Sequence, residues 1–265
     1  MSSSGFRTTR TLNLWKGVDV MRKSAYLCAL VLLICSASAW GTVGDYIIRD
    51  DRVYRIAGGR QTLVEDASFD SAKTDAGLWS WLLVDPDLSD GMKGAESGVY
   101  FFRGKEYAPV FFLPMEHAGA CMMEFSTSGE KLLICHGEEV RQDLGYYVLE
   151  EAAQGFVKKG SFVSAGHAFW VDPHRFVFTM IDAKKGPRSK AGDDWWCSAA
   201  MYDSVENELI VIKKATAAND YIISGVDHEG GTLDITESSV KNPKDWGSEN
   251  RIKYREFTVP IPAAG

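Results

Sequence analysis

Short apolar stretches separated by polar turn clusters run along the chain from residue 46 onward. Most of them are rich in β-branched and aromatic residues and are bounded by Gly, Asp, Pro or Ser, and no sustained 3.6-residue apolar period accompanies them. This pattern is typical of β-strands and predicts an all-β fold with less than about a tenth helix. The predicted strands cover residues 46–49, 52–56, 79–84, 99–103, 110–113, 121–125, 131–135, 146–149, 156–158, 168–171, 175–181, 199–202, 208–212, 221–226, 232–236 and 254–259.

A strand followed by a tight polar turn recurs at similar intervals. The turns contain Asp85, Ser128, Asp172 and Asp227, which are 43, 44 and 55 residues apart. Ala-Gly pairs 42 and 47 residues apart keep the same phase. Because propeller blades repeat every ~40 to 50 residues, this spacing favours a β-propeller of about five blades. A β-sandwich is the alternative.

Each unit continues with an outer hairpin. These hairpins join residues 98–102 with 108–113, 145–149 with 155–157, and 201–203 with 208–212. Such strand–turn–strand units, with Asp-Pro or Ser-Gly turns, resemble the TolB-like and related periplasmic propellers over about residues 79–261. The resemblance is one of architecture and implies a propeller. At the repeat positions there is neither the Gly-His to Trp-Asp pairing of WD repeats nor the Gly-Gly doublet of kelch repeats.

The N-terminal segment has the features of a secretory signal peptide. Met-Arg-Lys at 21–23 precedes an apolar stretch at 25–35 and then Ser-Ala-Ser-Ala at 36–39. An apolar core of this length is too short to span ~30 Å of hydrocarbon, and the small residues predict cleavage after Ala39. The chain would then consist of an extension and signal peptide at 1–39 and one exported domain at 40–265, secreted or periplasmic. An uncleaved membrane anchor is the alternative.

Composition and charge exclude several classes. The chain has 265 residues, 45% of them hydrophobic and 12% aromatic, which is too apolar for a disordered protein. Removing residues 1–39 would leave 24 Lys and Arg against 35 Asp and Glu, a formal charge of -11. Such a surface repels nucleic acid and anionic lipid and attracts cations or basic partners.

Polar residues just before the first strand of each unit form the predicted ligand site. If these strands line a channel, such residues gather at one mouth. The predicted ligand-binding residues are Asp75, Glu116, His117, His167 and Asp220. Carboxylates and imidazoles there are suited to a hard cation, or to the paired carboxylates of a glycoside hydrolase. Short polar residues at strand entries also cap turns, which is the structural alternative.

A second candidate is an aromatic platform made by Trp195 and Trp196, whose faces could stack on a sugar or a protein partner. The alternative is that both rings cover a blade edge. No two histidines have the spacing of a helical metal pair, and no Gly-x-Ser-x-Gly elbow is present. We therefore expect no metal ligands, no cofactor and no assigned catalytic residue.

Three cysteines follow residue 39, namely Cys121, Cys135 and Cys197. A hairpin turn centred on Ser128 and Gly129 places Cys121 opposite His136, one residue away from Cys135. A β-bulge would shift this register and allow a Cys121–Cys135 disulfide, which an oxidising compartment favours. The alternative keeps all three thiols reduced and buried.

These observations favour an exported, monomeric binding or scaffold module built as a β-propeller, with a protein or carbohydrate ligand and without a membrane span in the mature chain. A glycoside hydrolase of the five-bladed type is the first alternative, and two mouth carboxylates about 5 to 9.5 Å apart would favour it. A structural component of a cell-envelope assembly is the second, and a large exposed apolar patch would favour it.

Overall fold

The structure is a computed structural model, and it describes residues 46–65, 67, 69–87, 89–104, 109–116, 121–137, 140–150, 155–188 and 195–263. The chain divides into two compact units, residues 1–42 and 43–265, and all described residues belong to the second. The predicted signal peptide and its cleavage site therefore lie outside the described residues. No helix in the described part is long and apolar enough to cross a membrane.

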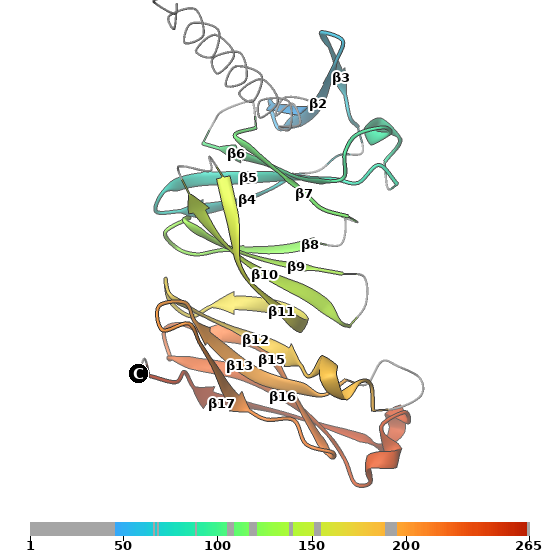
Figure 1. Ribbon diagram of the computed structural model, residues 1–265, viewed down its shortest axis with the longest axis vertical. Coiled ribbons are helices and arrows are strands. Elements are labelled where there is room, and N and C mark those ends of the chain that lie inside the picture. Colours follow the sequence, from blue (N-terminus) through green and yellow to red (C-terminus); the bar gives the residue numbers. More distant parts are fainter. Residues whose placement is uncertain are drawn as a thin grey trace, which may run out of the picture. The chain divides into compact units, whose positions relative to one another are not determined.

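Four antiparallel sheets make up the described part of the chain (Figure 1). Sheet A contains β1 (Tyr46–Arg49), β2 (Arg52–Ala57) and β3 (Arg60–Leu63). Sheet B contains β4 (Phe69–Thr74), β5 (Gly77–Val84), β6 (Gly98–Arg103) and β7 (Phe111–Pro114). Sheet C contains β8 (Cys121–Phe125), β9 (Lys131–His136), β10 (Gln142–Glu150), β11 (Gly155–Trp170), β12 (Arg175–Ile181), β13 (Cys197–Asp203) and β14 (Glu208–Lys213). Sheet D contains β15 (Asn219–Asp227), β16 (Thr232–Val240) and β17 (Ile252–Pro260).

Helix is confined to single 3-10 turns in the residues described. These are η1 (Asp90–Met92), η4 (Ala183–Lys185), η5 (Pro243–Asp245) and η6 (Glu249–Arg251). The predicted all-β class is thus confirmed. Within each sheet the strand order follows the chain order, and the predicted outer hairpins pair as β6–β7, β10–β11 and β13–β14. None of the sheets formed by the described residues closes on itself, so the five-bladed propeller is not confirmed and the sandwich alternative is equally plausible.

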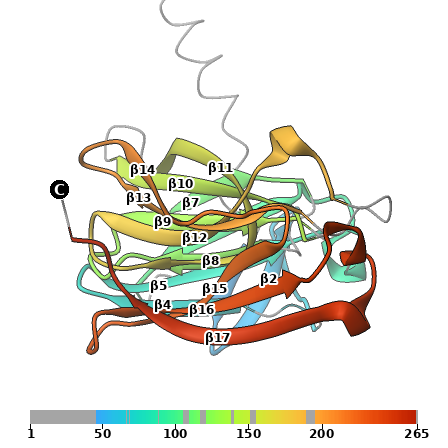
Figure 2. The same ribbon diagram turned by 90° about the horizontal axis from the view of Figure 1, so that it is seen from below.

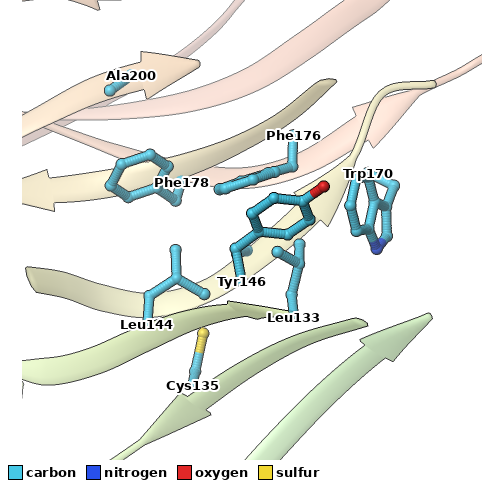
Figure 3. Close-up of a cluster of buried hydrophobic side chains, with 9 residues drawn as sticks. Leu133, Cys135, Leu144, Tyr146, Trp170, Phe176, Phe178 and Ala200 are labelled. Atoms are coloured by element: carbon cyan, nitrogen blue, oxygen red, sulfur yellow. The ribbon is translucent and has the colours of Figure 1, made fainter. Parts of the chain in front are cut away.

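The central strands of sheet C are buried on both faces. On β9, Leu133 and Cys135 belong to a core cluster with Tyr146 and Phe176 (Figure 3), whereas Leu132 and its neighbour at 134 pack in a second cluster with residues of sheet B. Successive side chains of a strand point to opposite faces. An uninterrupted apolar run such as Leu-Leu-Ile-Cys therefore specifies a strand with a packed layer on each side.

Sheet C bends along β11, its longest strand. The N-terminal part of β11 pairs with β10, and the C-terminal part pairs with β12. The pairing shifts between Ser164 and Ala168, where Gly166 has a φ of +74°. A glycine adopts this left-handed conformation without the strain that a side chain would add. The cluster around Phe176 is consequently enclosed between the two parts of one sheet.

The strand–turn repeat is out of phase in its first unit. Ser128 and Asp227 lie in or next to the β8–β9 and β15–β16 turns, which follow the first strands of sheets C and D, and Asp172 lies in the β11–β12 turn within sheet C. Asp85 instead follows β5, the second strand of sheet B. The corresponding turn of sheet B contains Asp75, so the interval of 43 residues from Asp85 to Ser128 does not join equivalent turns.

The predicted Cys121–Cys135 disulfide is wrong: both thiols are free, as is that of Cys197. Strands β8 and β9 pair without a bulge, with Cys121 opposite His136 and Met122 opposite Cys135. This offset turns the two cysteines to opposite faces of the sheet. Cys135 therefore lies in the cluster around Phe176, whereas Cys121 packs against the cluster that contains Leu132. The Cys121 Sγ is 3.0 Å from the Met115 Sδ.

Candidate functional site

The residues predicted to share a channel mouth lie in different settings. Asp75 is exposed in the β4–β5 turn, where its N–H donates to the Thr127 carbonyl at 2.8 Å. Thr127 follows β8, whereas Glu116 is exposed and precedes the same strand. Five strand residues separate the two ends, which corresponds to ~16 Å. The structure therefore does not bring Asp75 together with Glu116. His117 lies outside the described residues.

His167 and Asp220 differ in burial and in contacts. His167 is exposed on β11, with its ring 6.0 Å from that of Phe169. Asp220 is buried at the start of β15, where its carboxylate lies 2.7 Å from a guanidinium nitrogen of Arg188 and accepts a 2.8 Å hydrogen bond from the Cys197 N–H. The Asp220 carboxylate is thus bound to other groups of the protein, whereas the His167 side chain is exposed to solvent.

The predicted aromatic platform is covered by cations of the chain itself. Trp195 and Trp196 are half-buried. The Lys185 Nζ and the Arg188 guanidinium carbon lie 4.2 and 4.4 Å from the Trp196 ring centre, and the Arg141 guanidinium carbon lies 5.6 Å from that of Trp195. A cation over the face of an indole ring is attracted electrostatically by the quadrupole of the ring. A stacking ligand would have to displace them, so the arrangement fits a packing role for both rings.

Arg188 forms the centre of a buried cluster. Its guanidinium lies over Trp246 as well as Trp196, at 4.4 Å from each ring centre, and donates to the Thr216 carbonyl at 2.7 Å and to the Asp220 carboxylate. The charge is compensated by the carboxylate, as a buried guanidinium requires. This cluster joins the segment before β13 to the start of β15.

Lys131 occupies a junction between three hairpins. Its Nζ is 2.7 Å from the Pro173 carbonyl, 3.2 Å from the His174 Nδ1 and 3.3 Å from the Ser204 Oγ. Burial lowers the pKa of Lys131, against the opposing effect of nearby carboxylates. The Ser204 hydroxyl donates to the His174 carbonyl at 2.7 Å. Since the lysine and the serine both donate hydrogen bonds to backbone carbonyls of the neighbouring turn, these side chains hold the turns of the three hairpins together.

An open groove of about 420 Å³ lies on sheet D, whose three strands run side by side in Figure 2. Its polar side chains are two carboxylates and three hydroxyls. They belong to Ser224, Asp234, Thr236, Glu256 and Thr258. The groove is thus a shallow polar surface rather than an enclosed apolar cavity.

Alternation over residues 232–236 of β16 and 256–260 of β17 produces this surface. Leu233 and Ile235 are buried against sheet C, while Asp234 between them is exposed. On β17, Phe257 likewise packs inward while Glu256 is exposed. Because side chains alternate between faces, one face of sheet D belongs to the core and the other carries the polar groups.

Strand register sets the spacing of the groove residues. Asp234 is directly opposite Thr258, and Thr236 is directly opposite Glu256. The two carboxylates are therefore diagonal neighbours, whose Cα atoms in an antiparallel pair lie ~7 to 8 Å apart. The register of β15 shifts at Ser224, and a Cβ added at Gly225 would lie 3.1 Å from a carboxylate oxygen of Asp234. The glycine thus leaves room for this side chain.

Tyr254 extends the same face beyond the groove. It lies two residues before Glu256 on β17 and is 66% exposed. Strands at 232–236 and 254–259 are predicted from the sequence, but their polar side chains were not among the predicted site residues. The missed signal was the alternation of hydroxyl and carboxyl residues with apolar ones in Thr-Leu-Asp-Ile-Thr, which marks a sheet face left open to solvent.

No known family model matches this chain, and no curated protein matches it. Among solved structures, one similar chain is titled "Crystal structure of the eukaryotic initiation factor". It is 12% identical, with a TM-score of 0.39, over 82% of this chain and 50% of that one. This chain therefore spans about half the length of that structure. A likeness this weak supports no conclusion about fold or function.

Proposed function

We propose that this chain is an exported binding module that holds a carbohydrate on the outer face of sheet D. The observation that carries the proposal is the open polar groove across β15, β16 and β17. An extended hydrophilic ligand fits such a surface, whereas small apolar ligands are typically held in enclosed pockets.

The groove residues match the chemistry of a polyhydroxylated ligand. The carboxylates of Asp234 and Glu256 accept hydrogen bonds from hydroxyl groups, and the side chains of Thr236 and Thr258 both donate and accept them. Neither carboxylate forms an ion pair with a cation of the described residues. The exposed ring of Tyr254 adds a flat apolar surface with a polar tip. Negative charge on this face disfavours anionic ligands.

We further propose that the layers behind this face are blade-like. Alternate residues of β6 belong to different clusters, with Val99 and Phe101 in one and Tyr100 and Phe102 in another. The same division occurs on β9 and β12. Strands packed on both faces are what a propeller-like series of layers requires, and the strand groups β1–β3, β4–β7, β8–β11, β11–β14 and β15–β17 would be its layers. Their role is to hold the outer face of sheet D rigid.

Binding to immobilised neutral, acidic and amino polysaccharides tests the proposal. We expect saturable binding, weakened about tenfold by Glu256→Gln and by Asp234→Asn, because each removes a charge-assisted hydrogen-bond acceptor. Glu249→Gln is the matched control, since Glu249 is exposed but lies outside the groove. Absence of binding to every polysaccharide, or equal binding by all variants, would contradict the proposal.

A glycoside hydrolase that uses the same groove is the second candidate. The diagonal spacing of Asp234 and Glu256, ~7 to 8 Å between Cα atoms, is compatible with the ~5 to 9.5 Å between carboxyl groups that such enzymes need. Release of reducing ends from a bound polysaccharide, abolished by either carboxylate variant, would favour the hydrolase. Binding without release would favour the module.

A further inference from the structure

Strand β14 forms an outer edge of sheet C. Among the described residues it pairs only with β13. Its sequence is Glu-Leu-Ile-Val-Ile-Lys, and the side chains of Leu209 and Val211 are 41% and 43% exposed. The inward-facing side chains of Ile210 and Ile212 pack against the core cluster shared with sheet D. An edge of this kind leaves backbone N–H and C=O groups available for another strand.

Two of the other sheet edges carry features that hinder such pairing. Strand β17 has a charged residue at Lys253 near its start and two more at Arg255 and Glu256 in its middle, and β7 ends in Pro114. Charges and prolines on edge strands are common protections against association. Strand β14 has four apolar residues in a row with charges only at its two ends. The apolar centre of β14 therefore has the composition of a pairing strand.

The charges that flank β14 are arranged for pairing with a second copy. Glu208 is its first residue and Glu206 lies in the turn before it, whereas Lys213 is its last residue and Lys214 follows. Antiparallel pairing of two identical strands places the start of each beside the end of the other. Acidic residues of one copy thereby face basic residues of the second copy, while parallel pairing would bring like charges together.

We propose that this chain forms a two-fold dimer by antiparallel pairing of β14 with β14 of a second copy. A two-fold axis normal to the sheet keeps each face on the same side, so directly paired residues have numbers of equal parity. The register centred on Ile210 places the exposed Leu209 beside Val211 of the second copy. It also places Glu208 opposite Ile212 of the second copy, next to Lys213 and Lys214, at the end of the strand where the pairing of β14 with β13 shifts. The two seven-stranded sheets become one continuous sheet.

Sedimentation equilibrium of the full chain tests the dimer at concentrations from ~1 to ~100 µM, a range that detects micromolar association. We expect a mass twice that of the 29.3 kDa chain at the upper end. The Val211→Lys variant introduces a charge at the centre of the pairing and should raise the dissociation constant about tenfold or more. Val140→Lys is the matched control, because Val140 is 49% exposed but lies before β10. A monomer throughout the range would overturn the proposal.

Charge reversal identifies the pairing more specifically. Lys214→Glu should weaken the dimer, because it leaves three acidic residues together. Adding Glu208→Lys to that variant places opposite charges beside each other again across the interface and should recover part of the association. These positions are exposed, so folding should be preserved, and circular dichroism would verify it. A dimer that is insensitive to Val211→Lys and to Lys214→Glu would overturn pairing through β14.

Discussion

Strand β12 in sheet C and strand β16 in sheet D show two ways of building a strand of this protein. On β12, Phe176, Val177 and Phe178 are all fully buried, and they belong to clusters on opposite faces of the sheet. On β16, Leu233 is equally buried, but Asp234 beside it is exposed and lines the groove. One strand uses both of its faces for packing, and the other uses one.

The difference explains which strands of the protein can carry side chains that bind a ligand. A strand between two packed layers has no free face, so its side chains contribute free energy of folding and little else. A strand in a layer covered on one side keeps polar side chains at a fixed spacing on a rigid support. This is the arrangement that a ligand-binding surface needs. The variants below should therefore separate the two kinds of strand by their effects on stability.

The largest effect is expected at the centre of sheet C. Phe176→Ala should lower the free energy of unfolding by about 3 to 5 kcal/mol, because it removes a ring that contacts Tyr146, Phe162, Trp170, Phe178 and Tyr202 and leaves a cavity. Urea unfolding followed by tryptophan fluorescence measures the change. A loss of less than about 1 kcal/mol would contradict the close packing described for this cluster.

The second effect concerns the junction between the two regions. Arg188→Met should cost about 3 kcal/mol, because it leaves the buried carboxylate of Asp220 without its cation. The double variant with Asp220→Asn should recover much of the loss, since a neutral amide needs no counter-charge and its oxygen still accepts from the Cys197 N–H. The two single variants and the double variant form a cycle, and simple additivity would contradict the ion pair.

Local pattern predicted much of the fold. Runs such as 131–135 and 175–181 predicted strands because several consecutive apolar residues are typical of a strand buried on both faces. Turn geometry predicted the register of β8 and β9, since the turn centred on Ser128 and Gly129 pairs Cys121 with His136. The disulfide failed because it needed a bulge that no local signal required. Exposed strands were missed: β3 and β4 have polar sequences, Arg-Gln-Thr-Leu and Phe-Asp-Ser-Ala-Lys-Thr.

The groove could not be located from sequence for a different reason. Which sheet keeps an open face depends on long-range packing, and the alternation in β16 is equally compatible with a face covered by another polar layer. The burial of Asp220 was likewise invisible, because its partner Arg188 lies 32 residues away in a segment that reads as a surface loop. The predicted mouth combined residues from opposite ends of β8 because the phase of the first repeat was wrong.

Alkaline pH should destabilise sheet C through its thiols. Burial raises the pKa of Cys135 to about 11 and that of Cys197 to about 12, from the usual 9.0. Below pH 9 both states of the protein hold these protons, and above it the unfolded state releases them first. Stability is therefore complete below pH 9 and lost as the pH rises toward 11 to 12, by about 1 kcal/mol per thiol at pH 10.

The control for this prediction is a variant in which both cysteines are alanine. Its free energy of unfolding should depend less steeply on pH between 9 and 10 than that of the parent chain, although its absolute stability is lower. Urea unfolding at pH 8, 9 and 10 gives both slopes. Equal slopes in the two proteins would show that the buried thiols do not titrate at higher pH than in the unfolded chain.

The smallest effect is expected on the outer face of sheet D. Tyr254→Ala should change the free energy of unfolding by less than about 0.5 kcal/mol, because the side chain is 66% exposed. The same truncation should weaken polysaccharide binding, if the ring forms part of the ligand surface. Equal unfolding curves combined with weaker binding would separate the two roles of a strand, since truncating a buried residue of β12 is expected to lower the stability. A stability loss above about 1 kcal/mol would instead assign Tyr254 to the packing of the sheet and remove it from the binding face.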